Sequence, residues 1–188
     1  SAGGGQAPRP LGTAREPESA GHGVRTLQHR IQQAAKDSGV SQLVVERDWV
    51  QGYVLLGIAS HAVLREHLVF KGGTALRKVY FQGYRFYAAL DFSMAGGPSQ
   101  DALVRELQVA TAAGEAVARR LAPVTLAIER YEEREPHLGG QEAFVVRAQL
   151  PWQRRPMVPV KLELTRDEPV LLDAPPRTVT HGYQEELE

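Results

Sequence analysis

The residues with the clearest chemical potential lie in two short stretches of the chain. Phe70 to Arg77 reads FKGGTALR, and Arg85 to Phe92 reads RFYAALDF. An apolar strand that ends in a Gly-Gly turn lets the backbone approach a ligand closely, because glycine has no side chain and adopts positive φ freely. Cationic side chains at the turn would neutralise phosphate, and an acid on the following strand would hold a divalent cation. Together these features indicate a triphosphate site of the metal-dependent nucleotidyltransferase kind.

The Gly-Gly turn is formed by Gly72 and Gly73. If a helix begins at Thr74, its free N–H groups and its dipole favour an anion there, and Thr74 is a suitable N-cap. Lys71 and Arg77 would add cationic contacts to phosphate. The alternative is an ordinary strand–turn–helix in which the glycines only make the bend.

Asp91 is the acid of the second stretch, between the apolar residues Leu90 and Phe92. Strand alternation places residues 89 and 91 on one face and the apolar pair on the other. Two carboxylates so placed could bind two divalent cations about 3.5–4 Å apart for in-line phosphoryl displacement. Here that face carries Ala89 and one carboxylate, so the alternative for Asp91 is a solvated acid at a strand end.

A third segment, Val158 to Thr165, alternates as VPVKLELT. Its period of two predicts a half-buried strand with Lys161 and Glu163 on the face opposite the apolar residues. These two side chains either join Asp91 in a site or simply cover the solvent face of the sheet.

The run LVFKGGTALRKVYFQGYRFYAALDFSM strongly resembles the AbiEii/AbiGii toxin family of nucleotidyltransferase-like proteins, whose usual form is close to FKGGTALRK(V/L)YF…YRFSEDLDFS. The matching positions are Phe70 to Phe81, Tyr84 to Phe86 and Leu90 to Ser93. The resemblance extends from about Val24 to the C-terminus. It implies a polymerase-β-like fold, in which the third acid comes from a strand beside the acid pair, and this puts Glu163 in that role.

The resemblance also implies a reaction: transfer of a nucleoside monophosphate from an NTP to an RNA acceptor, with tRNA ends as the expected substrate. It implies Mg²⁺ or Mn²⁺ as cofactor, an antitoxin protein as partner, and a toxin–antitoxin or phage-defence setting. The residues it assigns are Asp91, Glu163 and Lys161 for catalysis, the first two also as metal ligands, and Lys71, Gly72, Gly73, Thr74 and Arg85 for the nucleotide.

The sequence departs from the family pattern in two places. Tyr87, Ala88 and Ala89 stand where the family has Ser, Glu and Asp. The family's C-terminal helical half, which supplies a further Lys and Asp, has no counterpart before Glu188. A second hypothesis therefore stands beside the enzyme: a relative that keeps the fold and binds a nucleotide or partner but does no chemistry.

Composition sets further limits. The chain has 188 residues, zero net charge and no cysteine, which excludes disulfides, zinc–thiolate sites and a global field that attracts nucleic acid. No apolar run is long enough to span a bilayer, so we expect no membrane association and a cytoplasmic protein. Residues 1–23 are rich in Gly, Pro and charged residues and predict a disordered tail, followed by one nucleotidyltransferase-like domain over 24–188.

The hydrophobic pattern predicts the elements that position these residues. We expect helices over 24–38, 46–66, 74–81 and 101–121, strands over 68–71, 90–94, 124–132, 143–150 and 158–165, and a charged connection over 132–140. This order predicts an α+β fold, with a mixed sheet that bears helices mainly on one face. It matches the minimal nucleotidyltransferase fold that the resemblance implies.

Overall fold

The computed structural model describes residues 19–131, 141–166, 168–171 and 173–183. Its helices are α1 (Ser19–Ser38), α2 (Gln42–Ser60), α3 (Ala62–His67), α4 (Gly72–Ala75), which continues as a π-helix over Leu76–Tyr80, and α5 (Gln100–Ala118); its strands are β1 (Leu68–Lys71), β2 (Ala89–Met94), β3 (Thr125–Arg130), β4 (Gln141–Gln149) and β5 (Val158–Thr165). The strands form one sheet in the order β1-β2-β5-β4-β3. The α+β class and the mixed sheet are therefore confirmed.

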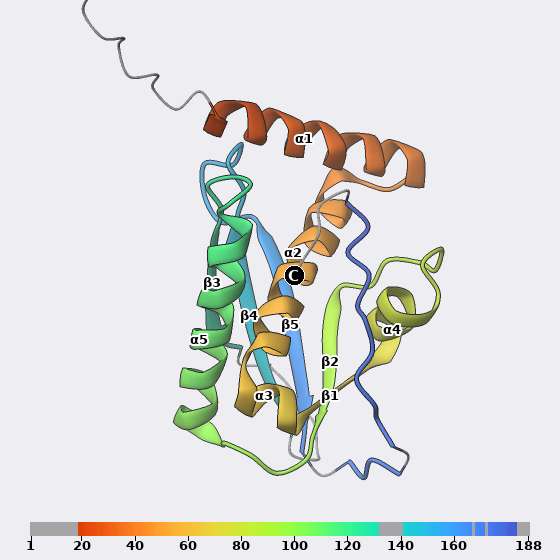
Figure 1. Cartoon of the computed structure of the whole chain (residues 1–188), viewed down its shortest axis with the longest axis vertical. Helices are drawn as coiled ribbons and strands as arrows, with labels where there is room; N and C mark the ends of the chain where they lie inside the picture. Colours follow the sequence, from red (N-terminus) through yellow and green to blue (C-terminus); the bar gives the residue numbers. More distant parts are fainter. Residues whose placement is uncertain (1–18, 132–140, 167, 172, 184–188) are drawn as a thin grey trace, which may run out of the picture.

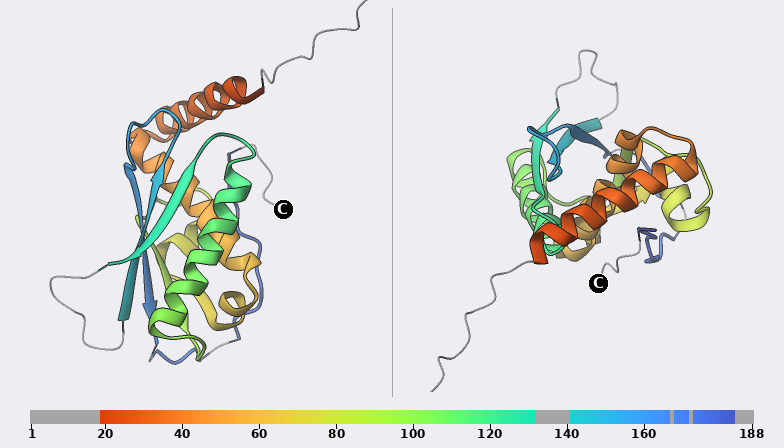
Figure 2. Two further views of the ribbon diagram at one scale, coloured as in Figure 1. Left: turned by 90° about the vertical axis from the view of Figure 1, so that its left-hand side faces the viewer. Right: turned by 90° about the horizontal axis from the view of Figure 1, so that it is seen from above.

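The sheet has one covered face and one open face. Helices α2, α3 and α5 lie on the same side of it (Figures 1 and 2). Strand β2 pairs with β5 in parallel, and the other neighbouring strands pair antiparallel. In β2, Leu90 and Phe92 are buried while Asp91 is half-buried, and in β5 the residues Leu162 and Leu164 are fully buried while Glu163 is half-buried. The alternation predicted from sequence thus places both acids on the open face.

Helix α2 forms the centre of the core. Its sequence is apolar on several sides, which is typical of a helix covered by neighbours all round. The helix crosses α5 where Gly57 and Gly114 bring the two backbones together: a Cβ atom at Gly57 would collide with the carbonyl oxygen of Ala110, and one at Gly114 with that of Tyr53. These glycines allow the close packing of α2 against α5.

The element boundaries lie within four residues of the sequence prediction, apart from three differences. The predicted helix over 46–66 is divided in two at His61, whose side chain accepts a hydrogen bond from the Leu64 amide and so begins α3. Helix α1 begins at Ser19, inside the segment predicted as a disordered tail; the rest of that tail, residues 1–18, lies outside the described residues, as does the connection 132–140. The helix predicted from Thr74 begins at Gly72 and changes to a π-helix at Leu76.

The segment from Asp173 to Tyr183 runs beside α4 and returns to α2 (Figure 1). The Thr180 amide donates to the Lys78 carbonyl at 2.8 Å. The Tyr183 hydroxyl lies 2.7 Å from a carboxylate oxygen of the buried Asp48 on α2. These contacts attach the C-terminal end of the described chain to α2 and to the π-helix that follows the Gly-Gly turn. None of the described helices is both long and apolar enough to cross a membrane.

Candidate nucleotide and metal site

Three charged residues occupy one lateral row of the sheet. Lys71 is the register partner of Asp91 across β1 and β2, and Asp91 is the register partner of Glu163 across β2 and β5. Neighbouring positions in a sheet are close enough for their side chains to interact on one face. The structure therefore brings together the two acids that the sequence predicted as metal ligands, with a lysine beside them.

The Gly-Gly turn closes directly over this row. Gly72 has φ +74°, in the region that favours glycine, and a Cβ atom there would come within 3.0 Å of the Asp91 carboxyl carbon. At Gly73 a Cβ atom would collide with the ring of Tyr87. Both glycines are thus required by close approach of a side chain, which places the backbone of the turn between the acid row and an aromatic ring.

The electrostatics of the row centre on Asp91. Burial raises its pKa, and the neighbouring charge of Glu163 and a hydrogen bond to that carboxyl raise it further, although Lys71 and Lys161 act in the opposite direction. Two carboxyl groups held this close together disfavour joint ionisation. The arrangement favours anything that supplies positive charge to both, whether a proton or a cation.

Glu163 makes several contacts on the open face. One of its carboxylate oxygens lies 2.6 Å from the ammonium of Lys161, and the other accepts a hydrogen bond of 3.1 Å from the Gln141 side chain. The Lys161 ammonium also lies 5.4 Å from the centre of the Tyr131 ring. The predicted catalytic residue Lys161 is therefore next to the acid pair, and Gln141 and Tyr131 are neighbours that the sequence did not indicate.

Lys71 is engaged by a residue that sequence reasoning missed. Its ammonium pairs with Glu168, and the same carboxylate oxygen accepts a hydrogen bond of 2.7 Å from the Ser93 hydroxyl. These two hydrogen bonds lower the pKa of Glu168. The lysine that was expected to contact phosphate is thus already paired with a carboxylate. No sequence motif points to Glu168, because it is 97 residues from Lys71 and the two come together only when the chain folds.

Two of the side chains predicted to bind the nucleotide, those of Thr74 and Arg85, do not point into the acid row. Thr74 is fully buried, and its hydroxyl donates to the Ala89 carbonyl at 2.5 Å. It is not the N-cap, which is Lys71; the helix starts earlier because Gly72 adopts the turn conformation itself. Arg85 is exposed, and its guanidinium lies 4.8 Å from the centre of the Tyr87 ring. Because the Thr74 hydroxyl is already bonded, this residue could contact a phosphate only through its backbone.

The carboxylates of Asp91 and Glu163 fit the metal that the resemblance implies only in part. Mg²⁺ in phosphate-transfer sites is held by one or two carboxylates together with the substrate phosphates, and Asp91 and Glu163 supply that number in adjacent register. The position that would provide a third carboxylate is Ala89. Among the residues that the structure describes, no group of three or more His, Asp or Glu side chains is arranged to hold a metal ion. The chemistry of the donors fits one cation shared with a phosphate ligand and does not fit a two-cation site built from protein acids alone.

A mixed sheet with helices on one face and acids beside a Gly-Gly turn on the other defines a minimal nucleotidyltransferase fold. The sequence model of the family described as "Nucleotidyl transferase AbiEii toxin, Type IV TA system" matches residues 53–188. The chain belongs to this family of toxin–antitoxin nucleotidyltransferases, as the sequence resemblance predicted. No curated protein gives a significant sequence match.

The raised pKa of Asp91 leads to a prediction about stability. A folded-state pKa above the unfolded value of about 3.9 means that the folded chain binds the proton more tightly, so the free energy of unfolding falls as pH rises through this interval and stays lower at neutral pH. Asp91→Asn removes that penalty. We expect the variant to have a higher melting temperature than the parent at pH 7 in the presence of EDTA, and the difference to shrink toward about pH 4.

Thermal denaturation followed by circular dichroism across this pH range measures the effect. Asp101→Asn, at an exposed position in the first turn of α5, is a matched control that changes the same chemical group away from the row. If Asp91→Asn is less stable than the parent at neutral pH, the Asp91 carboxylate stabilises the fold, and the explanation by burial and repulsion from Glu163 is wrong.

Proposed function

We propose that this chain binds a nucleoside triphosphate together with Mg²⁺ or Mn²⁺ and transfers its nucleoside monophosphate to an RNA acceptor, with a tRNA end as the expected acceptor. The observation that carries the proposal is the adjacent register of Lys71, Asp91 and Glu163 beneath the Gly-Gly turn. Membership of a nucleotidyltransferase toxin family supports the reaction class, and an antitoxin protein is the expected partner.

In this proposal the chain's own residues position and neutralise the triphosphate. Asp91 and Glu163 would hold the cation, which supplies positive charge against the phosphate oxygens when bound. Lys71 and Lys161, on either side of the acid pair, offset negative charge on the triphosphate, and the backbone at Gly72 and Gly73 approaches the phosphates. The acceptor hydroxyl loses its proton as its oxygen bonds to the α-phosphorus, and pyrophosphate leaves with the electrons of the broken P–O bond.

A second candidate function is nucleotide or partner binding without turnover. Two observations favour it: Ala89 replaces one metal-binding acid on the open face, and Glu168 already neutralises Lys71. Preorganised charge at the reacting centre is usually the largest contribution to rate, so losing one metal carboxylate weakens catalysis more than it weakens binding. We therefore expect weak transfer relative to a family member with the full acid set.

The experiment that tests the proposal is calorimetric titration of NTP with and without Mn²⁺. We expect binding to require the metal, and Asp91→Asn to weaken it about tenfold, which corresponds to roughly 1.4 kcal/mol. A transfer assay with a labelled NTP and tRNA then separates the two candidate functions, because label in the RNA requires turnover. Asp101→Asn serves again as the control.

Metal-independent binding that Asp91→Asn leaves unchanged would overturn the site assignment. Metal-dependent binding with no label transferred would select the binding-only function. Transfer that Asp91→Asn abolishes but Asp101→Asn preserves would establish the enzyme.

A further inference from the structure

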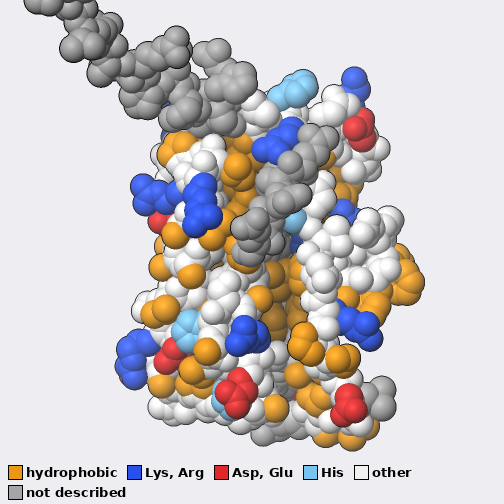
Figure 3. Space-filling view, viewed as in Figure 1, with side chains coloured by type: hydrophobic (Ala, Val, Ile, Leu, Met, Phe, Trp, Pro, Cys, Tyr) orange, Lys and Arg blue, Asp and Glu red, His pale blue; other side chains and the backbone are white. Residues whose placement is uncertain are grey.

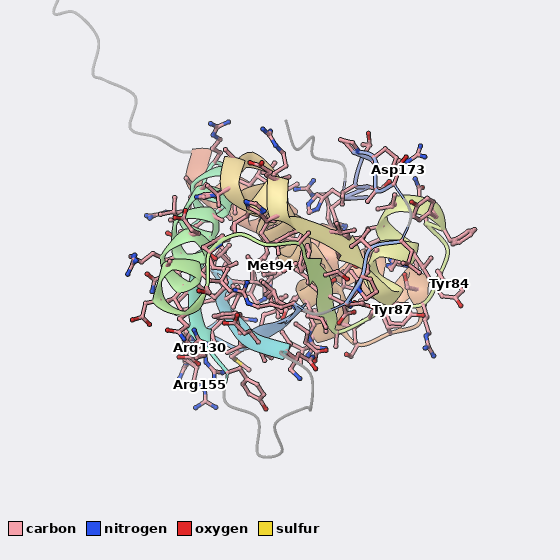
Figure 4. The ribbon with its side chains drawn as sticks, turned by 90° about the horizontal axis from the view of Figure 1, so that it is seen from below. Tyr84, Tyr87, Met94, Arg130, Arg155 and Asp173 are labelled. Atoms are coloured by element: carbon pink, nitrogen blue, oxygen red, sulfur yellow. The ribbon has the colours of Figure 1, made fainter. Side chains whose placement is uncertain are left out.

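A row of aromatic side chains leads away from the Gly-Gly turn. The ring of Tyr87 packs against Gly73, and the rings of Tyr87, Tyr84, Phe81 and Tyr80 follow one another with centroid separations of 6.1, 6.3 and 6.4 Å. The stacking surface, defined as these four rings and Arg85, lies at one edge of the molecule. Figure 4 shows Tyr84 and Tyr87 together at that edge, and Figure 3 shows hydrophobic side chains gathered there over α4 and the loop after it.

Three of these four rings are exposed and Tyr87 is half-buried; exposed apolar rings are costly unless something binds them. Tyr80 and Phe81 each retain 59% of their surface and Tyr84 retains 48%. Large apolar groups concentrated on one surface are typical of interaction sites. The π-conjugated faces accept nucleobases without preference for sequence, and this is how many single-strand binders hold their ligand.

The charge around the stacking surface suits a polyanion. From Leu68 to Leu90 the chain contains no acid and four cations. Lys78 is buried beside Asp48, Arg77 pairs with the same acid and Lys71 pairs with Glu168, so Arg85 is the cation that this segment presents at the surface. Arg85 is exposed, and its guanidinium lies over the Tyr87 ring. A guanidinium over an aromatic ring can stack on a base and pair with a phosphate. On a chain of zero net charge, an exposed arginine beside a run of rings that contains no acid gives a nucleic-acid strand both a stacking partner and a phosphate partner.

The loop that carries the rings is held in shape. Arg77 donates to the carbonyl oxygens of Gln82, at 3.2 Å, and Tyr84. The Arg77 guanidinium also lies 3.8 Å from the centre of the Phe86 ring. One side chain thus fixes the loop from its inner side and leaves the outer rings free to bind, which lowers the entropy cost of ordering them on a ligand.

The spacing of two rings is slightly less than a base requires between them. Tyr84 and Tyr87 have ring planes within 23° of parallel and centroids 6.1 Å apart. A base between two rings needs two stacking steps, or about 6.8 Å at ~3.4 Å per step. A small outward movement of the exposed Tyr84 opens that gap.

We propose that Tyr80, Phe81, Tyr84, Arg85 and Tyr87 form a binding surface for single-stranded RNA, along which an acceptor strand reaches the acid row. The ligand class is a single strand because only unpaired bases expose their faces to rings. That the strand is the acceptor rests on the proposed function; strand binding itself does not. Tyr87, which replaces the small polar residue of the family pattern, extends the surface as far as the Gly-Gly turn.

The test is fluorescence anisotropy with a labelled single-stranded oligoadenylate of about eight nucleotides, without metal or NTP. We expect Tyr84→Leu/Tyr87→Leu to weaken binding at least about tenfold, because leucine keeps the apolar contact but removes the π-face. Tyr84→Phe/Tyr87→Phe is the matched control and should bind like the parent. Val109→Ala, at an exposed apolar position on α5, should also have no effect. Thermal melts of all variants check that the fold is intact.

Three further measurements keep the outcomes distinct. Arg85→Gln should reduce the slope of binding against salt concentration, because one phosphate contact is lost. Asp91→Asn should abolish any transfer yet leave oligoadenylate binding unchanged, so failure of the proposed function is separable from failure of this surface. Duplex RNA of the same length should bind more weakly than the single strand.

Three results would overturn the proposal. The first is that the Leu and Phe double variants bind the oligonucleotide with equal affinity. The second is that the Leu variant loses NTP affinity but keeps its oligonucleotide affinity, which would assign the rings to the base of the NTP. A third is a parent chain that ignores RNA but self-associates in sedimentation, with the Leu variant monomeric, which would assign the rings to a second copy of this chain.

Discussion

The variant Tyr87→Ser/Ala88→Glu/Ala89→Asp is expected to bind Mn²⁺ about ten- to a hundredfold more tightly than the parent chain, or roughly 1.4–2.8 kcal/mol. Ala89 shares the open face with Asp91 and is the register partner of Lys161. A carboxylate there would complete a set of three acids on two adjacent strands, and the affinity of such sites rises with the number of charged ligands. Calorimetric titration of MnCl₂ without nucleotide measures the change.

Ala88→Asp alone is the control for this experiment. Residue 88 is exposed and precedes the first residue of β2, and strand alternation directs its side chain away from the face of residue 89. It adds one of the two negative charges of the triple variant without adding a ligand on the open face. Equal Mn²⁺ affinities in the control and the triple variant would show that the gain is a general effect of charge and that residue 89 does not face the metal.

The three departures at 87–89 change what the site presents. Relative to the family pattern they remove two acids and add an aromatic ring, and the structure puts that ring against Gly73. Ala89→Asp should therefore strengthen the metal site, while Tyr87→Ser shortens the stacking surface. Manganese affinity and oligonucleotide affinity are expected to change in opposite directions in the triple variant, because its substitutions add two acids and remove one stacking ring.

The sheet was predictable from sequence because alternation is a local signal. Strands β1 and β5 have the predicted bounds, and β2 begins one residue earlier than expected. The acid row followed from the same rule, since Asp91 and Glu163 both lie opposite apolar neighbours in their strands. The family resemblance, and not periodicity, placed β5 beside β2; that the two strands pair in parallel with Asp91 and Glu163 in register is a finding of the structure.

The turn and the helix after it were harder to predict. A Thr after two glycines is a common N-cap pattern, but Gly72 itself adopts positive φ and Thr74 is buried against the Ala89 carbonyl. The division of the long helix at His61 depends on a side-chain hydrogen bond to the Leu64 amide. Such signals are indistinguishable in sequence from a continuous amphipathic run.

The side-chain partners of the site were beyond sequence reasoning. Glu168 reaches Lys71 across a separation of 97 residues, and Gln141 reaches Glu163 across 22. Contacts of this kind depend on which side chains the strand order brings to one face. The aromatic segment had a visible signal in its five rings within eight residues, but whether they are buried or exposed depends on how the loop packs.

A buried charge network joins the Gly-Gly turn to the rest of the fold. Asp48 on α2 is 4% exposed and lies 3.1 Å from the ammonium of Lys78, which is 2% exposed. It also contacts Arg77 at 3.4 Å and the Tyr183 hydroxyl at 2.7 Å. One carboxylate thus holds the π-helix after the turn, the residue that shapes the aromatic loop, and the C-terminal end of the described chain.

Asp48→Ala is expected to lower the free energy of unfolding by about 3–5 kcal/mol, because it leaves the charge of Lys78 buried without its carboxylate. Urea denaturation at pH 7 measures this loss. Asp48→Ala/Lys78→Met is the control, and it should recover much of the stability since no isolated charge remains. A loss below about 1 kcal/mol in the single variant would place the stability of the turn elsewhere.

The pH dependence of the same variant identifies the cause. Burial lowers the pKa of Lys78 more than Asp48 raises it, so the folded chain binds fewer protons than the unfolded chain between the lowered value and about 10.4, and stability rises with pH through that interval. Removing Asp48 widens the interval. The deficit of Asp48→Ala relative to the parent should therefore shrink between pH 7 and about pH 9.5, whereas a deficit caused by lost packing alone would not change with pH.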